Sequence, residues 1–170
     1  FTGAYPDNED EVWDELADGS YRAEGDLEII GRPLDFLGIN YYRPIMLRDA
    51  PHREPDPVRR TAVDIRTEQV SFEGVRHTTM GWPVVPDTFT DLLIDLDRRY
   101  PNLPPILITE NGSAEDDRPD ESGRVRDTDR IAYLRDHLNA LSRAIDAGVD
   151  VRGYFVWSLL DNFEWAFGYD

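Results

Sequence analysis

Three short apolar runs, separated by two segments of helical periodicity, constrain the fold of this chain more than any other feature. The runs occupy residues 33–42, 104–109 and 151–157. Apolar runs of this length, bounded by proline, glycine and polar residues, are typical of buried strands. Strands that alternate with helices form a parallel sheet with the helices packed outside it. We therefore expect an α/β architecture with parallel strands.

Both expected helices carry an apolar stripe. The first begins at a cap near Thr88 or Thr90 and is closed by Pro101. Its apolar residues are Phe89, Leu92, Leu93, Leu96 and Tyr100. The second follows an N-cap at Asp127 and stops at Gly148, which takes the C′ position. Its expected stripe is Ile131, Leu134, Leu138, Leu141 and Ile145.

Two long segments lack a core pattern. Residues 1–30 hold ten acids and one base, which indicates an acidic surface segment with short helical pieces around 9–16 and 26–30. Residues 43–80 are rich in proline and charge. A connection of this length in a compact domain is usually a functional loop or lid. We expect a long active-site loop there, with a minor hairpin at 70–75.

No residue pattern indicates a metal or a cofactor. His137 falls on the polar side of the second helix, where we expect it to be solvated, and it shares no ligand spacing with His52 or His77. Residues 115–121 are acidic but lack the alternation of a calcium loop, so we expect solvated surface. No glycine-rich phosphate loop occurs. We expect neither a metal nor a cofactor.

Charge restricts the partners of the chain. Its 170 residues carry 35 acids against 18 bases, all arginine, and the net charge is −17. This balance argues against nucleic acid and anionic membranes as partners. Cysteine is absent, which excludes disulfides and thiolate chemistry. No run approaches the ~20 apolar residues of a membrane span, and residues 1–6 do not resemble a signal peptide, so we expect a cytoplasmic protein.

Glu110 is the clearest functional candidate. It ends the apolar run at 104–109 and is followed at once by Asn111 and Gly112. In parallel α/β sheets this position faces the active-site crevice, where a carboxylate suggests covalent or acid–base chemistry. A structural carboxylate that satisfies a helix N-terminus or an arginine is the alternative.

The other strand ends also carry polar and aromatic groups. They hold Asn40, Tyr41 and Tyr42 after the first run and Trp157 and Ser158 after the last, and such ends converge on one edge of a parallel sheet. Beyond Trp157, Glu164 and Trp165 follow in one loop. Indole rings stack on sugar rings and carboxylates accept hydrogen bonds from vicinal hydroxyls, which predicts a site for a sugar or another polyol.

Four segments together resemble glycoside hydrolase family 1, the β-glucosidase family of retaining (β/α)8-barrel enzymes. They are residues 35–42 (DFLGINYY), 80–82 (MGW), 108–112 (ITENG) and 154–165 (YFVWSLLDNFEW). The segments occur in the family's order, and the resemblance runs from about Gly25 to the last residue. A departure from the usual pattern is Pro83, where many members carry an acid.

The resemblance implies a role for each site residue. Glu110 would be the catalytic nucleophile that forms a glycosyl-enzyme intermediate. Tyr42 would hold that carboxylate by a hydrogen bond, and Asn40 would lie beside it. Trp157 would form the sugar platform.

The same resemblance bears on the sugar. Glu164 would accept hydrogen bonds from the 4- and 6-hydroxyls of the sugar, and Trp165 would bind the neighbouring 3-hydroxyl. A carboxylate at Glu164 would repel a 6-phosphate, so unphosphorylated glycones are favoured. The expected substrate is a β-glucoside or a related oligosaccharide or aryl glycoside.

The resemblance also implies that part of the catalytic apparatus lies elsewhere. The family's acid/base belongs to an Asn-Glu-Pro motif, and the one Asn-Glu pair of this chain, at Asn8, is followed by Asp10. A complete barrel takes roughly 250 residues. We therefore expect the C-terminal portion of the barrel, about its last three strands with their helices, whose partner is the missing N-terminal part. We expect the isolated chain to be inactive or nearly so.

Two alternatives remain open from the sequence. One is a carbohydrate-binding pseudoenzyme remnant that retains Trp157, Glu164 and Trp165 for recognition; the presence of both Glu110 and Tyr42 weighs against it. The other is a piece that does not fold alone, because unpaired strand edges favour aggregation or association with the missing segment.

Overall fold

The structure is a computed structural model that describes residue 4, residues 23–52 and residues 67–169. Most of the acidic segment 1–30, including the helical piece expected at 9–16, lies outside the described residues. The second expected piece is present as helix α2 (Asp26–Ile30), none of whose residues is buried.

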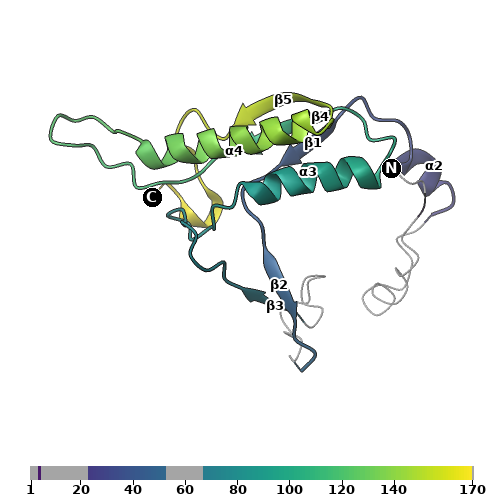
Figure 1. Cartoon of the computed structure of the whole chain (residues 1–170), viewed down its shortest axis with the longest axis horizontal. Helices are drawn as coiled ribbons and strands as arrows, with labels where there is room; N and C mark the ends of the chain where they lie inside the picture. The colour runs from purple at the N-terminus through teal and green to yellow at the C-terminus, as the bar shows by residue number, and fades with distance from the viewer. Residues whose placement is uncertain (1–3, 5–22, 53–66, 170) are drawn as a thin grey trace.

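The three apolar runs form one parallel sheet, as predicted. Its strands are β1 (Leu37–Asn40), β4 (Ile106–Asn111) and β5 (Val151–Val156), in the spatial order β1-β4-β5. Both pairings are parallel, so the carboxyl ends of the strands lie at one edge of the sheet (Figure 1). This order places Glu110 on the central strand.

The helices α3 (Asp87–Arg99) and α4 (Thr128–Asp146) pack side by side against this sheet (Figure 1). The Thr90 hydroxyl joins them by donating to the carbonyl of Ala140 at 2.9 Å. The core lies between the helices and the sheet, and its buried members are Tyr41, Phe89, Leu93, Ile106, Ile108, Ala140, Leu141, Ala144 and Val149. Burial of these side chains is the main term that holds the helices to the sheet.

The outer strands are less buried than predicted. In β1, Leu37 and Ile39 are half-buried while Gly38 and Asn40 are exposed, and in β5 Phe155 and Val156 are exposed. Both strands lie at an edge of the sheet. Within the described residues, the core forms where α3 and α4 pack on the sheet. Apolar side chains on an uncovered side of the sheet therefore remain in water.

Helix α3 has the predicted apolar face but begins before its predicted caps. Its N-cap position is Pro86, without a side-chain cap, and Phe89 and Leu93 are fully buried. The Thr88 hydroxyl donates to the carbonyl of Val85 at 2.6 Å, and Thr90 contacts α4 instead. The helix ends at Arg99, consistent with a stop before Pro101.

The predicted stripe of α4 is largely wrong. Ile131, Leu138 and Ile145 are exposed, Leu134 is half-buried, and Leu141 is the one predicted member that is buried. The helix instead buries Tyr133, His137, Ala140, Leu141 and Ala144. Small alanines allow the helix to approach the sheet closely, while Tyr133 and His137 stack at 3.9 Å between ring centroids. The inward face was therefore selected by shape and not by the number of leucines.

The prediction that His137 is solvated is wrong. It is fully buried, its Nδ1 lies 2.9 Å from the carbonyl of Tyr133, and the burial lowers its pKa. Asp127 occupies the predicted N-cap position, but in a left-handed conformation with φ 52° and without a capping hydrogen bond. Gly148 follows the C-cap with φ 105°, as expected for a C′ glycine.

A second, antiparallel pair lies within the long segment 43–80. It joins β2 (Met46–Asp49) and β3 (Thr67–Val70), and residues 53–66 between them lie outside the described part. The hairpin predicted at 70–75 is wrong: residues 71–76 form turns and irregular backbone. The strand partner of β3 is β2, which lies earlier in the chain. Arg48 faces Glu68, 20 residues further on, and the two side chains form an ion pair across the strands.

Among the described residues, no helix combines the length and apolarity needed to cross a bilayer. No group of three or more histidine, aspartate or glutamate side chains there has the arrangement of a metal site.

We expect two neighbouring leucines of α4 to differ sharply in their contribution to stability. Leu141 is 6% exposed and Leu138 is 45% exposed. Leu141→Ala should lower the free energy of unfolding by about 2–4 kcal/mol, because it removes buried contacts and leaves a cavity. The matched control Leu138→Ala should change it by less than about 1 kcal/mol. Equal losses in urea denaturation would show that the predicted stripe, and not the observed one, faces the core.

Candidate active site

The carboxyl ends of β1 and β4 bring Tyr42 and Glu110 into direct contact. The Tyr42 hydroxyl donates to Oε2 of Glu110 at 2.5 Å, although 68 residues separate them in the chain. Burial raises the pKa of Tyr42 well above its usual range, and the hydrogen bond to Glu110 and the charge of Glu110 raise it further. Tyr42 therefore remains a proton donor at neutral pH, and one oxygen of the Glu110 carboxylate is held in place.

An irregular register at the end of β4 separates Glu110 from its neighbour. Ile106, Ile108 and Asn111 are fully buried, so the alternation of a regular strand is interrupted after Ile108. The pairing with β5 shifts between Ile108 and Asn111, and the pairing with β1 shifts in the facing residues. A shift of one residue exchanges the faces of a strand. It turns Asn111 toward the helices and leaves Glu110 with Tyr42.

Asn111 joins three elements beneath the site. Its amide nitrogen donates to the carbonyl of Tyr41 at 2.7 Å and to the hydroxyl of Tyr133 at 3.1 Å. Its carbonyl oxygen accepts from Tyr154 at 2.5 Å, and Tyr133 donates onward to the carbonyl of Tyr42 at 2.9 Å. The strand ends on either side of Glu110 are thereby tied to each other and to α4.

Gly112 permits the close approach of the loop that follows β5. A Cβ atom at this position would lie 1.8 Å from the carbonyl oxygen of Trp157. Any other residue type would displace one of the two segments, because no real contact of that kind is so short. The glycine that follows Glu110 and Asn111 therefore positions Trp157 beside the carboxyl end of β4.

A cleft of about 800 Å³ opens at this edge of the sheet. Among the predicted site residues, Tyr42, Trp157 and Glu164 line it, whereas Asn40, Glu110 and Trp165 do not. The amide of Asn162 donates to Oε2 of Glu164 at 2.8 Å, which orients that carboxylate. Glu110 contacts one of these lining residues, because its carboxylate accepts the hydrogen bond of Tyr42.

Two of the predicted residues lie less closely within the site. Asn40 faces Glu110 in the strand register, but its side-chain oxygen accepts from the Thr109 hydroxyl at 2.6 Å. Trp165 is 85% exposed and begins a short 3-10 helix, η2 (Trp165–Phe167), in a left-handed conformation with φ 48°.

Trp82 also lines the cleft. Its segment, residues 80–82, contributed to the family resemblance, but the sequence analysis did not assign Trp82 to the site. Its ring lies edge-on to Tyr42 with centroids 5.5 Å apart, and the guanidinium of Arg43 lies 5.2 Å from its centroid. Thr79 and Met80 line the cleft beside it. An aromatic side chain after a turn is a weak signal by itself, because nothing in the sequence says which strand end the turn approaches.

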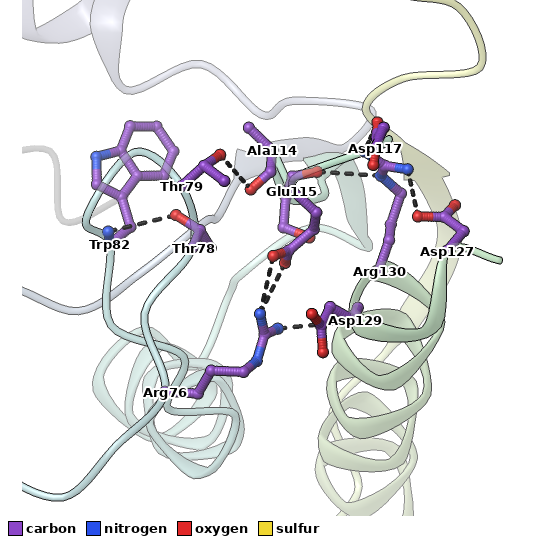
Figure 2. A network of polar contacts seen from close by, with 11 residues as sticks. Arg76, Thr78, Thr79, Trp82, Ala114, Glu115, Asp117, Asp127, Asp129 and Arg130 are labelled. Carbon is purple, nitrogen blue, oxygen red and sulfur yellow. Dashed lines mark hydrogen bonds and ion pairs between the residues drawn. The ribbon is translucent and has the colours of Figure 1, made fainter. Parts of the chain in front are cut away.

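Residues 115–121 are mostly exposed, as predicted, but Glu115 and Asp117 of this acidic loop pair with arginines from outside the loop. Arg130 of α4 donates to Asp117 at 2.6 Å, to Asp127 at 2.5 Å and to the carbonyl of Ser113 at 3.2 Å (Figure 2). The side chain of Glu115 is 7% exposed and pairs with Arg76. These contacts make one wall of the cleft from charged groups that are already neutralised by partners.

The cleft is therefore lined by the indole of Trp157 and the oriented carboxylate of Glu164, and its lining residue Tyr42 holds the carboxylate of Glu110. A carboxylate with one oxygen fixed can attack an electrophilic carbon with the other. The indole of Trp157 and the carboxylate of Glu164 suit a ligand with apolar ring faces and hydroxyl edges.

We expect Tyr154→Phe to lower the free energy of unfolding by about 1–3 kcal/mol, because it leaves the buried oxygen of Asn111 without a donor. Tyr169→Phe is the matched control, since Tyr169 is exposed and should change stability by less than about 0.5 kcal/mol. Urea denaturation measures both. Equal stability of the Tyr154→Phe variant and the parent chain would contradict the role given to Asn111.

Comparisons with known proteins agree with this arrangement. The model of the family described as glycosyl hydrolase family 1 matches residues 1–170. A bifunctional β-D-glucosidase/β-D-fucosidase of Bifidobacterium breve is 42% identical over 98% of this chain and 37% of its own length. The chain thus spans little more than a third of the curated relative.

Solved structures show the same partial match. The psychrophilic β-glucosidase of Micrococcus antarcticus is 43% identical, with a TM-score of 0.86 over 99% of this chain and 38% of that one. A β-glucosidase of Thermotoga maritima in complex with castanospermine is 38% identical, with a TM-score of 0.83 over 99% of this chain and 35% of that one. The three parallel strands and two helices are therefore similar to one part of a larger β-glucosidase fold.

Proposed function

Because the chain belongs to glycosyl hydrolase family 1, we propose that it forms the C-terminal portion of a retaining β-glycosidase. Its strands β1, β4 and β5 would be about the last three strands of a (β/α)8 barrel, with α3 and α4 on the outside. The partial coverage of the relatives supports this, because the chain matches about a third of their length at high structural similarity.

The observation that carries the proposal is the hydrogen bond from Tyr42 to Glu110. A nucleophilic carboxylate must present one oxygen to the anomeric carbon while the other is held. Glu110 meets this requirement at the carboxyl end of a central parallel strand, where barrel enzymes place catalytic groups. We assign it the role of nucleophile and Tyr42 the role of the residue that positions it.

The reaction would proceed in two displacements. A Glu110 oxygen attacks the anomeric carbon, the glycosidic C–O bond breaks, and the leaving oxygen takes a proton from a general acid. Water then attacks the anomeric carbon of the glycosyl ester and loses its proton to the same group, which now acts as a base. This step releases Glu110 and a sugar whose anomeric configuration is retained. The second carboxyl group stands about 5–5.5 Å from the nucleophile in retaining enzymes. We propose that the missing N-terminal part supplies it, because the chain has no Asn-Glu-Pro motif.

The residues that line the cleft support a proposal for the substrate class. Trp157 would support the sugar ring, and Glu164, Trp165 and Asn40 would bind hydroxyls from its edges. The carboxylate of Glu164 disfavours a phosphorylated glycone by charge repulsion, so we propose an unphosphorylated β-glucoside or a related oligosaccharide or aryl glycoside. The carbohydrate-binding alternative gains no support from the Tyr42–Glu110 contact, which recognition alone does not require.

The uncovered part of the sheet supports an association with the rest of a barrel. Phe155 and Val156 of β5 and Phe36, which precedes β1, are exposed apolar side chains. Both outer strands also present an unpaired edge within the described residues, and such edges pair readily with another strand. The missing N-terminal part of the barrel is the occupant that we propose for them.

We expect activity only when the barrel is complete. A chimera in which residues 1–170 replace the matching segment of the Bifidobacterium breve relative should hydrolyse an aryl β-glucoside. The isolated chain should be at least about 10²-fold slower, because acid assistance alone contributes about 10²–10⁴-fold. Comparable rates for the two would contradict the partial-barrel proposal.

The nucleophile is tested by covalent trapping in the same chimera. The substrate is a fluoroglucoside with a dinitrophenolate leaving group, which departs without help from an acid. Its fluorine slows the second displacement, so that the sugar ester accumulates. Mass spectrometry should locate the sugar ester on Glu110, and Glu110→Gln should abolish it. An ester on another residue, or sugar binding without any ester, would favour the binding alternative.

Tyr42→Phe should slow the formation of that ester. The lost charge-assisted hydrogen bond is worth about 1.5–3 kcal/mol, which corresponds to roughly 10–100-fold in rate. Stopped-flow release of dinitrophenolate in the chimera measures this step. An unchanged rate constant would remove Tyr42 from its assigned role while leaving that of Glu110 intact.

A further inference from the structure

We propose that Arg76 and Glu115 are positioning residues, whose ion pair holds Trp82 against Tyr42 at one wall of the cleft. The pair joins the turn that carries Trp82, residues 76–82, to the loop that follows Glu110, residues 112–117. Its existence is independent of the proposed function, and its effect on catalysis rests on that function.

The ion pair is unlike the other pairs of this acidic loop. Nη1 of Arg76 lies 2.9 Å from each carboxylate oxygen of Glu115, and Nη2 donates to the carbonyl of Asp129 at 3.4 Å (Figure 2). The Glu115 side chain is almost fully removed from water, whereas both partners of the nearby Arg118–Asp116 pair are exposed. Exposed pairs contribute little, but a desolvated carboxylate that loses its partner carries a large penalty.

The turn transmits the position of Arg76 to Trp82. The backbone N–H of Thr78 donates to the carbonyl of Trp82 at 2.9 Å, and the Thr78 hydroxyl accepts from the N–H of Trp82 at 3.3 Å. The N–H and the hydroxyl of Thr79 both donate to the carbonyl of Ala114, at 3.2 and 2.9 Å (Figure 2). The turn is therefore closed on itself and attached to the loop at Ala114, next to the ion pair.

Two contacts lead from Trp82 to the nucleophile. The edge of its ring meets Tyr42, and Tyr42 donates to Glu110. A shift of the turn would move Trp82 against or away from Tyr42, and with it the hydrogen bond from Tyr42 to the Glu110 carboxylate. Displacements of about 1 Å in such groups can cost up to about 10²-fold in rate.

The loop after Glu110 has its own attachment to α4, which makes the pair separable from folding. Arg130 holds Asp117 and the carbonyl of Ser113 without any contribution from Arg76. Loss of Glu115 should therefore leave the loop attached through Arg130, while the turn that carries Trp82 loses its ion pair and keeps the hydrogen bonds from Thr79 to Ala114. Arg130 attaches the loop to α4, and Arg76 adds an ion pair to the Thr79–Ala114 hydrogen bonds that join the turn to the loop.

Fluorine NMR of the 170-residue chain labelled with fluorotryptophan tests the proposal. The chain contains four tryptophans, and single Trp→Phe changes assign their resonances. Arg76→Met and Glu115→Gln should each move the Trp82 resonance toward its position in urea or broaden it, while the Trp157 resonance stays. The charge reversal Arg76→Glu with Glu115→Arg should restore it. Asp116→Asn, at the exposed pair, is the matched control and should leave all resonances in place.

Several outcomes would overturn the proposal. They are an unchanged Trp82 resonance in both single variants, no restoration by the charge reversal, and a shift of all resonances together, which indicates general unfolding. A parent chain whose Trp82 resonance already coincides with its urea position would overturn it as well.

Kinetics of the chimera separate this proposal from the proposed function. Glu115→Gln should slow ester formation on Glu110 by roughly 3–30-fold, and the charge reversal should recover most of the loss. An NMR response without any ester on Glu110 would retain the Arg76–Glu115 pair as a positioning device and reject the nucleophile. Ester formation that is unaffected by Glu115→Gln would reject the positioning role alone.

Discussion

Asn111 lies fully buried at the carboxyl end of β4, and its amide joins Tyr41, which follows β1, to α4 and β5. A buried amide must satisfy its donors and its acceptor, so the geometry of all three partners is restricted together. Glu110 precedes it and Gly112, on which Trp157 closely packs, follows it. The placement of Glu110 and of Trp157 therefore depends on the hydrogen bonds of one buried side chain beneath the cleft and not on the cleft itself.

The charged wall of the cleft is also held together by polar contacts between distant segments. Arginines from α4 and from the turn before α3 neutralise the acids of the loop after Glu110, so the loop is held from two sides. The opposite situation holds at the outer strands, where apolar side chains remain exposed and edges unpaired within the described residues. The chain is thus tightly ordered where the cleft is formed and open where we propose that the remainder of a barrel packs. Both properties suit a part of a larger catalytic fold.

Much of the fold was predictable because it depends on local periodicity. The order of strands and helices, the stop at Gly148 and the buried face of α3 follow from spacing that adjacent residues determine. The face of α4 was not, because alanine packing and the Tyr133–His137 stack outweighed a row of larger aliphatic residues. The contact of Tyr42 with Glu110 was anticipated through the family resemblance, and the geometry bears it out as a contact. Trp82 and Glu115 could not be placed, since their partners are distant in sequence.

Sequence alone therefore determined the parallel α/β order, the position of Glu110 at a strand end and membership of the family, because strand and helix periods and long motifs are written in consecutive residues. Tertiary structure decided which side of β4 each residue faces, since a register shift after Ile108 separates Glu110 from Asn111. It also decided that His137 and Glu115 are buried. A polar side chain can be buried only where other residues satisfy its hydrogen bonds. When these residues are distant in the sequence, no local pattern predicts the contact.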